Sequence, residues 1–325
     1  MKKRILSGMR PTGKLHLGNY VGALENWVNL QGEYENFHLV ADWHTLTTNL
    51  DTSGLQENTI EMVIDWLAAG IDPEQSPIFV QSQIKEHAEL YLIFSMLVTV
   101  PRLERNPTVK EQARDLGTES NIIFGHLGYP ILQAADILLY KAHLVPVGED
   151  QLPHVELTRE IARKFNKTYD DVLRVPSGKV TDFARLPGLD GNKMSKSLGN
   201  TILLSDSPEV IGKKVMRAVT DPQKIRRNDP GRPEVCNVFT YYKKFCPHRV
   251  AEVDAACRSG ELGCVEDKRN FAACLTKYLE PFREKRVQLE KNIDDIKDII
   301  ADGNRRAGEV AAQTMHEVYQ AMNLD

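Results

Sequence analysis

The sequence lacks the features that mark membrane and secreted proteins. None of its apolar runs approaches the 18 or more residues that a membrane-spanning helix requires. Its first residues, Met-Lys-Lys-Arg-Ile-Leu-Ser-Gly, lead into turn residues without the apolar segment of a secretory signal. We therefore expect a cytoplasmic protein with no membrane partner. Because the net charge is -4, a nucleic-acid partner would have to be bound by a local basic patch.

Cysteine is scarce and confined to the last third of the chain. The five cysteines are Cys236, Cys246, Cys257, Cys264 and Cys274. An odd number in a reducing compartment argues against a disulfide framework. Buried thiols and a metal site both remain open.

The sequence does contain a regular alternation of strand and helix patterns. At 325 residues, 42% of them hydrophobic, the chain is long enough for two domains with an ordinary core. Short apolar runs read as buried strands at 4–8, 37–42, 76–81 and 144–147. This order predicts an α/β fold with a doubly wound, parallel, Rossmann-like sheet. A mostly helical insertion is predicted over 86–141, and helical patterns fill 206–325.

The loop at 191–199, Gly-Asn-Lys-Met-Ser-Lys-Ser-Leu-Gly, has the composition of a mobile phosphate clamp. Lys193 and Lys196 are compact charges that can follow phosphate oxygens during a reaction, and Ser195 and Ser197 add neutral donors. A lone K-x-x-K more often belongs to a solvated loop, so this interpretation depends on the whole string.

A second anion-binding pattern follows the first strand. Pro11-Thr12-Gly13 form a turn, and a helical pattern begins near His16-Leu17-Gly18-Asn19. A helix N-terminus at the carboxyl edge of a parallel sheet binds anions. Gly18 permits close approach of a nucleotide, and His16 and Asn19 can donate hydrogen bonds to phosphate or ribose. Taken alone, a histidine in a loop is more often a surface residue.

Polar residues on one apolar helix predict a recognition site. Tyr129, Gln133 and Asp136 stand at i, i+4 and i+7, among isoleucines, leucines and alanines. A carboxylate there can accept one hydrogen bond from a ligand, and would be left with a costly unpaired charge if the ligand lacked the donor. An internal hydrogen-bond network among helices explains the pattern equally well.

The segment Gly148-Glu149-Asp150-Gln151 follows strand 144–147 and predicts another ligand-binding edge. Gly148, Glu149 and Asp150 suit a ribose, and Gln151 can reach an ammonium group. The alternative for Asp150 is a helix N-cap. His44, just past strand 37–42, is either a pocket wall or a structural histidine.

Several strings together resemble one enzyme family. They are S-G-M-R-P-T-G, G-N-Y-V-G-A-L, Q-A-A-D-I-L-L-Y, V-P-V-G-E-D-Q and K-M-S-K-S. With them the chain resembles the class I aminoacyl-tRNA synthetases, and among these the bacterial tryptophanyl-tRNA synthetases, over nearly its whole length. The resemblance implies ligation of L-tryptophan to tRNA(Trp) through an adenylate, using ATP and Mg²⁺. It also implies a class I catalytic domain over 1–205, a helical anticodon-binding domain over 206–325 and a homodimer.

The resemblance implies roles for particular residues. Tryptophan contacts are implied for Asp136, which accepts the indole N–H, and for Tyr129, Gln133, His44, Ser7, Val145, Val147 and Gln151. ATP contacts are implied for Arg10, Pro11, Thr12, Gly18, Asn19, Gly148, Glu149, Asp150, Leu186, Lys193, Met194, Ser195, Lys196 and Ser197. Catalytic roles are implied for Lys193, Lys196, Ser195, His16 and Asn19.

Two features of the sequence keep alternatives open. Asn19 stands where the family has a second histidine, and an amide cannot act as a general acid near neutrality. Tyr129, Gln133 and Asp136 also resemble the tyrosine-recognition residues of some tyrosyl-tRNA synthetases. An adenylyltransferase that makes a small cofactor, or an RNA-binding relative without catalysis, would be built on a similar sheet.

The C-terminal region carries two further patterns. Its basic residues are either a tRNA surface or a solvated face: Lys213, Lys214, Arg217, Lys224, Arg226, Arg227 and Arg232. Cys236, Cys257, Cys264 and Asp267 have the spacing C-x20-C-x6-C-x2-D. Some tryptophanyl-tRNA synthetases have a fourth cysteine at the last place and carry a [4Fe-4S] cluster. With Asp267 there, the expectation divides among an oxygen ligand, recruitment of Cys246, a degraded cluster and no cluster.

Overall fold

The computed structural model describes residues 2–148, 151–180 and 186–324. Its contacts divide the chain into two compact units. Unit 1 comprises residues 1–13, 26–182 and 292–325, and unit 2 comprises residues 14–25 and 183–291. We describe each unit by itself.

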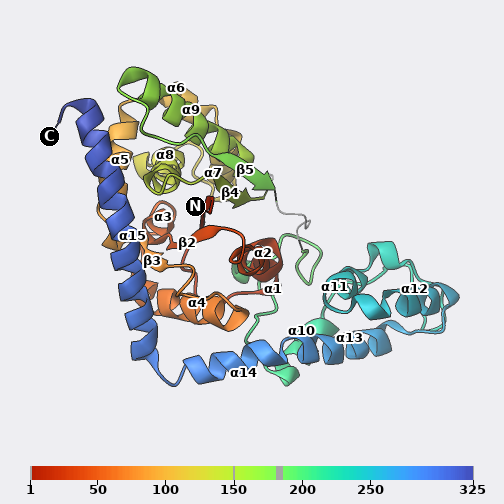
Figure 1. Ribbon diagram of the computed structural model, residues 1–325. Helices are drawn as coiled ribbons and strands as arrows, with labels where there is room; N and C mark the ends of the chain where they lie inside the picture. Colours follow the sequence, from red (N-terminus) through yellow and green to blue (C-terminus); the bar gives the residue numbers. More distant parts are fainter. Residues whose placement is uncertain (1, 149–150, 181–185, 325) are drawn as a thin grey trace. The chain divides into compact units, whose positions relative to one another are not determined.

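Unit 1 is built on a sheet of five parallel strands in the order β3-β2-β1-β4-β5 (Figure 1). The strands are β1 (Arg4–Met9), β2 (Glu35–Val40), β3 (Ile78–Val80), β4 (Leu144–Val147) and β5 (Ser177–Val180). The predicted α/β class with a parallel sheet is confirmed. Strand order reverses at β1, so the carboxyl ends of β1 and β4 form the switch point where ligands bind in such sheets.

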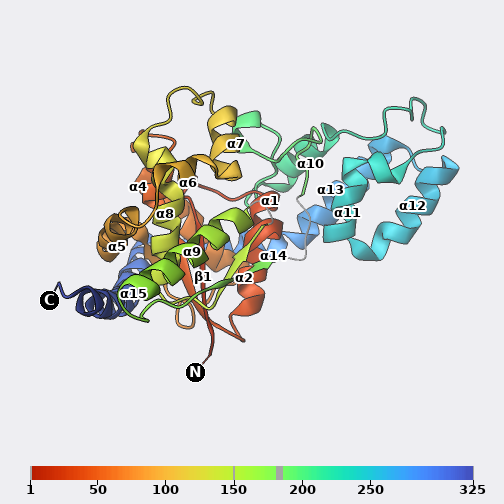
Figure 2. The ribbon, with the colours of Figure 1, turned by 90° about the horizontal axis from the view of Figure 1, so that it is seen from above.

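Helices pack on this sheet and on one another. They are α2 (Glu25–Leu30), which begins at the last residue assigned to unit 2, α3 (Asp42–Leu46), α4 (Leu55–Ala69), α5 (Glu86–Ser95), α6 (Val100–Glu104), α7 (Pro107–Asp115), α8 (Phe124–Leu139), α9 (Leu152–Thr168) and α15 (Ile293–Met322), with a 3₁₀ turn at Gln81–Gln83. Helix α8 lies between α5 and α9 and contacts both (Figure 2). The aromatic rings of Phe37, Phe79 and Tyr140 pack on one another in the core, with Phe37 stacked on Tyr140 and Phe79 edge-on to Phe37.

The long helix α15 packs against β3 at a glycine. A Cβ atom on Gly303 would lie 1.9 Å from the carbonyl oxygen of Ile78, so only glycine allows the helix this approach. The side chain of Asn304 accepts a hydrogen bond from the Val80 amide at 2.8 Å, which occupies a donor at the sheet edge. The 30 residues of α15 therefore belong to unit 1, which contains the sheet.

Unit 2 is mostly helical. Its helices are α1 (Leu17–Asn19), the π-helix Tyr20–Leu24, α10 (Pro208–Met216), α11 (Asn237–Phe245), α12 (Val250–Ser259), α13 (Cys264–Tyr278) and α14 (Glu280–Leu289), with 3₁₀ turns at Lys196–Leu198, Pro233–Val235 and Pro247–Arg249. Phe271 of α13 packs on Tyr241 and Tyr242 of α11, and these three rings form the centre of the unit's core.

One disulfide corrects an expectation drawn from the cysteines. Cys246 follows α11, Cys274 lies on α13, and their sulfur atoms are 2.04 Å apart. The packing of α11 against α13 brings together two cysteines that are 28 positions apart in the sequence. Cys236, Cys257 and Cys264 remain free thiols.

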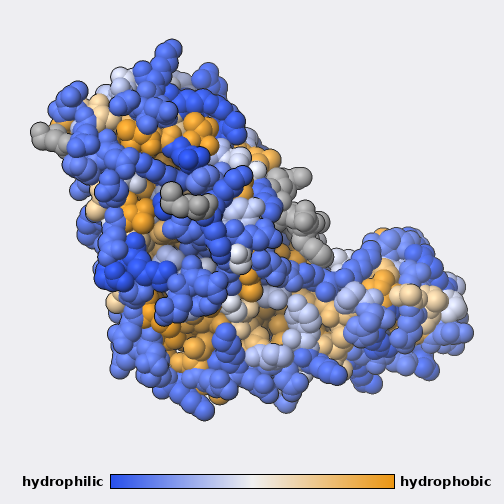
Figure 3. All heavy atoms as spheres, viewed as in Figure 1, coloured by the Kyte–Doolittle hydropathy of each residue, from blue (hydrophilic) through white to orange (hydrophobic). Residues whose placement is uncertain are grey.

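Two observations bear on the predicted organisation. The compact units do not divide at residue 205, because 183–205 belongs to unit 2 and α15 to unit 1. The functional division at that point stays a prediction. No helix of the described residues is long and apolar enough to cross a bilayer, and on the face seen in Figure 3 apolar residues form separate patches among hydrophilic ones.

Candidate functional site

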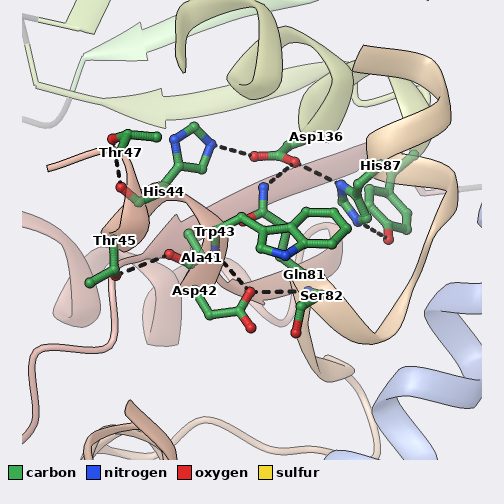
Figure 4. Close-up of polar contacts among 11 residues, drawn as sticks. Ala41, Asp42, Trp43, His44, Thr45, Thr47, Gln81, Ser82, His87 and Asp136 are labelled. Carbon is green, nitrogen blue, oxygen red and sulfur yellow. Dashed lines mark hydrogen bonds and ion pairs between the residues drawn. The ribbon is translucent and has the colours of Figure 1, made fainter. Parts of the chain in front are cut away.

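The centre of the candidate site in unit 1 is the carboxylate of Asp136 on α8. Three side chains donate hydrogen bonds to it (Figure 4): His44 Nε2 to Oδ2 at 2.9 Å, Gln81 Nε2 to Oδ1 at 2.7 Å and His87 Nδ1 to Oδ1 at 2.7 Å. The donors come from α3, from the turn after β3 and from α5. Four elements that are separate in sequence thus converge on one buried group.

The environment of Asp136 keeps it ionised. Burial raises its pKa, but the hydrogen bonds and charges of His44 and His87 outweigh burial and lower the pKa to about 2. A carboxylate can accept about four hydrogen bonds. Three are supplied by described residues, which leaves one acceptor position for a ligand.

A second carboxylate holds two of these donors in place. Asp42 Oδ1 accepts from the amides of Trp43 at 2.9 Å and Ser82 at 3.0 Å (Figure 4). Trp43 precedes His44, and Ser82 follows Gln81. Asp42 therefore fixes the backbone beside both donors.

Tyr129 lies about two turns before Asp136 on the same face of α8, among three histidines. Its hydroxyl is 2.8 Å from His154 Nε2, and its ring stands edge-on to those of His44, His126 and His154. The amide of Asn106 lies 3.1 Å from His154 Nδ1, which orients that imidazole. The bond to His154 thus fixes the hydroxyl of Tyr129, while its ring lies beside that of His44.

The other residues predicted to bind the amino acid occupy β1, β4, α8 and the end of β4. Ser7 is buried on β1, and its hydroxyl makes no hydrogen bond with a described residue. Val145 and Val147 are buried on β4, and Gln151 caps α9 with its amide bonded to the Gly148 carbonyl at 3.0 Å. Gln133 is half-buried and is not among the donors to Asp136; the amide that bonds this carboxylate belongs to Gln81.

Unit 1 also contains some of the residues that are predicted to contact ATP. Burial lowers the pKa of the Arg10 guanidinium, whose Nη1 donates to Thr48 Oγ1 at 3.3 Å. Pro11 is buried and Thr12 is exposed, and they form the turn after β1. Glu149 and Asp150 lie outside the described residues.

The segment at 16–19 forms a closed cap in unit 2. His16 Nδ1 accepts from the Asn19 amide at 3.2 Å, and Asn19 Oδ1 accepts from the His16 amide at 3.1 Å. Burial, followed by the charge of Lys196, lowers the pKa of His16 to about 4. At neutral pH the imidazole is therefore uncharged, with Nδ1 as acceptor and Nε2–H as donor. Asn19 serves the backbone and needs no titratable proton for that.

The lysine loop packs directly against this cap. The Gly18 amide donates to Met194 Sδ at 3.3 Å, and Leu17 and Leu15 exchange backbone hydrogen bonds with Ile202 and Leu204. A Cβ atom on Gly18 would lie 3.0 Å from the His16 ring and 3.3 Å from Met194 Sδ, so the contact is tight. The two segments that the sequence predicts to act on one nucleotide are neighbours.

Asn200 holds the loop in shape. It is buried, accepts from the Ser195 amide at 2.8 Å, and donates to Asp190 Oδ1 at 2.8 Å and to the Lys193 carbonyl at 3.0 Å. Lys193 is exposed, Lys196 is half-buried, and the hydroxyls of Ser195 and Ser197 are 2.9 Å apart. Leu186, another predicted ATP contact, is buried at the start of this region.

Some residues of both parts escaped the sequence analysis. They are Asn200 in unit 2 and Gln81, His87, Tyr140 and His154 in unit 1. His87 gave one usable signal, because it lies in a helix of otherwise apolar inward positions. Gln81 gave none, since its partner is 55 positions away.

Cys236, Cys257, Cys264 and Asp267 do not fit a metal cluster in this arrangement. Among the described residues no group of three or more histidines, cysteines or carboxylates could hold a metal ion. Burial raises the pKa of Cys236 to about 11 and also raises that of Cys257, so both are protonated thiols. Cys246 is bonded to Cys274, which overturns its recruitment as a ligand.

Comparison with known proteins gives the family. The model of the class I tRNA synthetases for tryptophan and tyrosine matches residues 1–280. Tryptophan–tRNA ligases are 51% identical in Thermotoga maritima, with 99% of each chain covered, and 45% identical in Aquifex aeolicus, with 99% of this chain and 100% of that one covered. The chain belongs to this synthetase family. A crystal structure of the tryptophanyl-tRNA synthetase of Campylobacter jejuni, complexed with ADP and tryptophan, superposes with a TM-score of 0.88 at 33% identity, covering 99% of this chain and 100% of that one.

The family resemblance predicted from the sequence is therefore confirmed for this synthetase, and with it the use of ATP that is general to class I. A tyrosyl-tRNA synthetase from Archaeoglobus fulgidus matches at 22% identity and a TM-score of 0.67, which reflects the common fold alone. The tyrosine alternative is not favoured, because the full-length relatives are tryptophan enzymes.

Proposed function

We propose that the chain is a tryptophan–tRNA ligase, which activates L-tryptophan with ATP and transfers it to tRNA(Trp). The observation that carries the proposal is the carboxylate of Asp136. It is buried and ionised, and it has three protein donors and one acceptor position left. An indole N–H fills that position, whereas a side chain without a donor leaves the charge unsatisfied.

The remaining residues around Asp136 complete the amino-acid site. Tyr129 and His44 bound the indole, with Val145 and Val147 as apolar walls. Ser7 and Gln151 meet the polar end of tryptophan; the buried Ser7 hydroxyl supports this role because it has no described partner. Gln133 borders the site without bonding Asp136.

The segments at 16–19 and 193–197 bind ATP. The neutral His16 donates from Nε2 to a phosphate oxygen, Gly18 gives the nucleotide access to the backbone, and Asn19 keeps His16 in position. Met194 packs on Gly18 and so joins the lysine loop to this cap. Arg10, Pro11, Thr12, Gly148, Glu149, Asp150 and Leu186 are assigned to the same substrate.

Activation needs no covalent bond to the protein. The tryptophan carboxylate attacks the α-phosphorus of ATP, the bond to the bridging oxygen breaks, and pyrophosphate leaves. Lys193 and Lys196 stabilise the charge that develops on pyrophosphate, with Ser195 and Ser197 as further donors. The terminal ribose hydroxyl of tRNA then displaces AMP. Mg²⁺ is held mainly by the phosphates.

Unit 2 offers a surface for tRNA. Lys213, Arg217 and Arg226 are exposed cations on or after α10. Other members of the basic run are engaged within the unit, since Arg232 pairs with Asp221 and Lys214 with Asp206. We assign the helical region predicted over 206–325 to anticodon binding and these exposed cations to phosphate contacts.

Exposed apolar side chains on α5 and α8 support a homodimer. Leu92 on α5 is 58% exposed, Met96 directly after α5 is 71% exposed, and Phe124 is 68% exposed at the start of α8, which packs on α5. A second copy of the chain covers this surface. We place the enzyme in the cytoplasm, where tRNA is charged.

Exchange of labelled pyrophosphate into ATP tests the proposal. We expect exchange that depends on tryptophan and is absent with tyrosine, followed by charging of tRNA(Trp). Exchange with tyrosine alone would identify the sibling enzyme, and exchange without charging would identify an adenylyltransferase. No exchange with either amino acid would leave an RNA-binding relative.

A further inference from the structure

One of the donors to Asp136, His87, makes a further hydrogen bond through its other ring nitrogen. His87 Nε2 is 2.9 Å from the hydroxyl of Tyr140, while His87 Nδ1 is 2.7 Å from Asp136 Oδ1. Both His87 and Tyr140 are fully buried. Figure 4 shows Asp136 of α8 bonded to His87 of α5, and Tyr140 is the residue that follows α8.

The two ring nitrogens of His87 have different partners, Asp136 and Tyr140. The carboxylate of Asp136 can only accept, so Nδ1 of His87 carries a hydrogen. Nε2 accepts from the Tyr140 hydroxyl when the imidazole is neutral and donates to it when the imidazole is charged, so in both forms this hydroxyl is the partner of Nε2. Tyr140 and Asp136 thus occupy the two nitrogens of His87, and no described residue other than His87 bonds the hydroxyl of Tyr140.

We propose that Tyr140 and His87 are positioning residues for amino-acid selection, which hold the Asp136 carboxylate so that its remaining acceptor position is offered to the indole N–H. This inference rests on the proposed role of Asp136. It adds that selectivity depends on a tyrosine that does not touch the substrate.

Loss of the Tyr140 hydroxyl acts through the ring of His87. Without this hydroxyl, buried Nε2 has no partner among the described residues, whether it carries a hydrogen or a lone pair, and the ring loses the bond that fixes its rotation. Either arrangement weakens the bond to Oδ1. The carboxylate is then held only by His44 and Gln81, and it can turn away from the position that serves the ligand.

The test compares tryptophan with L-β-(benzothiophen-3-yl)alanine, in which sulfur replaces the indole N–H. Pyrophosphate exchange gives kcat/KM for each. For Tyr140→Phe we expect kcat/KM for tryptophan to fall about tenfold, mainly through KM, while the value for the sulfur analogue changes less than twofold. The ratio of the two therefore falls, a result that a general loss of packing does not produce. Tyr242→Phe removes another buried hydroxyl, bonded to a carbonyl in unit 2, and should leave the ratio unchanged.

Two substitutions of His87 keep the inference testable if one variant folds poorly. His87→Asn places an amide donor near the position of Nδ1 and should resemble Tyr140→Phe. His87→Leu has no donor and should lower the ratio further. Equal ratios in His87→Asn, His87→Leu and the wild type would overturn the positioning role.

The outcomes separate this inference from the proposed function. If the wild type does not distinguish tryptophan from the sulfur analogue, Asp136 is not the indole acceptor and the proposed site is wrong. If the wild type distinguishes them and Tyr140→Phe keeps the full ratio, only the positioning role fails. In the background of Asp136→Asn, Tyr140→Phe should produce no further loss of the ratio, because both act on one contact.

Discussion

The charge of Asp136 is buried and fixed by its surroundings, whereas the lysine loop carries its charge on an exposed side chain. Asp136 is buried and three donors from separate elements fix it, so its charge can serve only a ligand that supplies one hydrogen at one point. Lys193 is exposed, and Asn200 shapes its loop through hydrogen bonds to the Ser195 amide and the Lys193 carbonyl. Selection of a rigid side chain benefits from a fixed partner, whereas a departing pyrophosphate needs cations that can follow it.

The strongest test of this contrast is removal of a loop cation. Lys196→Ala should lower kcat for tryptophan-dependent pyrophosphate exchange by about 10²–10³, as loss of one preorganised donor does, with little change in KM for tryptophan. Lys285→Ala removes an exposed lysine from α14 and serves as the control. An unchanged kcat in the loop variant would mean that the loop does not stabilise pyrophosphate.

The complementary change neutralises the fixed carboxylate. Asp136→Asn should lower kcat/KM for tryptophan by about a hundredfold, expressed mainly in KM, because a hydrogen bond to a charged acceptor is replaced. KM for ATP should stay close to the wild-type value. A loss confined to kcat, with tryptophan binding intact, would contradict the assignment of Asp136 to recognition.

The framework of the lysine loop can be weakened without touching a charge. Asn200→Ala removes hydrogen bonds to the Ser195 amide and the Lys193 carbonyl. We expect about a tenfold fall in kcat for exchange, since two backbone groups lose their partner while both lysines remain. Limited proteolysis of the loop should become faster; cleavage and exchange rates equal to those of the wild type would show that Asn200 is dispensable.

A second buried carboxylate, that of Asp267, shows how hydrogen-bond donors affect the pKa of a buried carboxyl group. Asp267 is buried like Asp136, but its Oδ1 has no hydrogen-bond partner among the described residues, and burial raises its pKa to about 6. A raised carboxyl pKa stabilises the folded state below pH 4, and this contribution is lost as pH rises through 6. Between pH 5 and 7 the loss amounts to about 1 kcal/mol.

Urea unfolding at these two pH values, on the wild type and on Asp267→Asn, isolates this contribution. The amide does not titrate, so the variant should gain about 1 kcal/mol relative to the wild type between pH 5 and 7. An identical difference at both values would show that Asp267 is not buried as a carboxylic acid.

Local patterns were enough to predict the sheet and the anchor of each site. Strands β1 to β4 carry short apolar runs, and the spacing of Asp136 on an apolar helix marked it before any partner was known. Strand β5, Ser-Gly-Lys-Val, has no such run, because it is short and residues 177–179 are exposed, and the sequence analysis did not find it. Sequence patterns show whether a segment is buried far better than they show which segments it contacts in the fold.

Hydrogen-bond partners from distant parts of the sequence could therefore not be predicted. Gln81 and His87 reach Asp136 from positions 55 and 49 residues away, and no spacing rule links a turn after one strand to a later helix. The same holds for the approach of Gly303 to β3 and for the disulfide between Cys246 and Cys274. Tertiary packing sets all of these contacts.

The central claim is that unit 1 selects the amino acid through Asp136 while Lys196 in unit 2 stabilises the leaving group. A double-mutant cycle of Asp136→Asn and Lys196→Ala, measured as kcat and KM in pyrophosphate exchange, tests it most directly. The account predicts that one change acts on KM for tryptophan, the other on kcat, and that their free energies add to within about 0.5 kcal/mol. Both changes acting on the same constant, with a combined loss no larger than either alone, would contradict it.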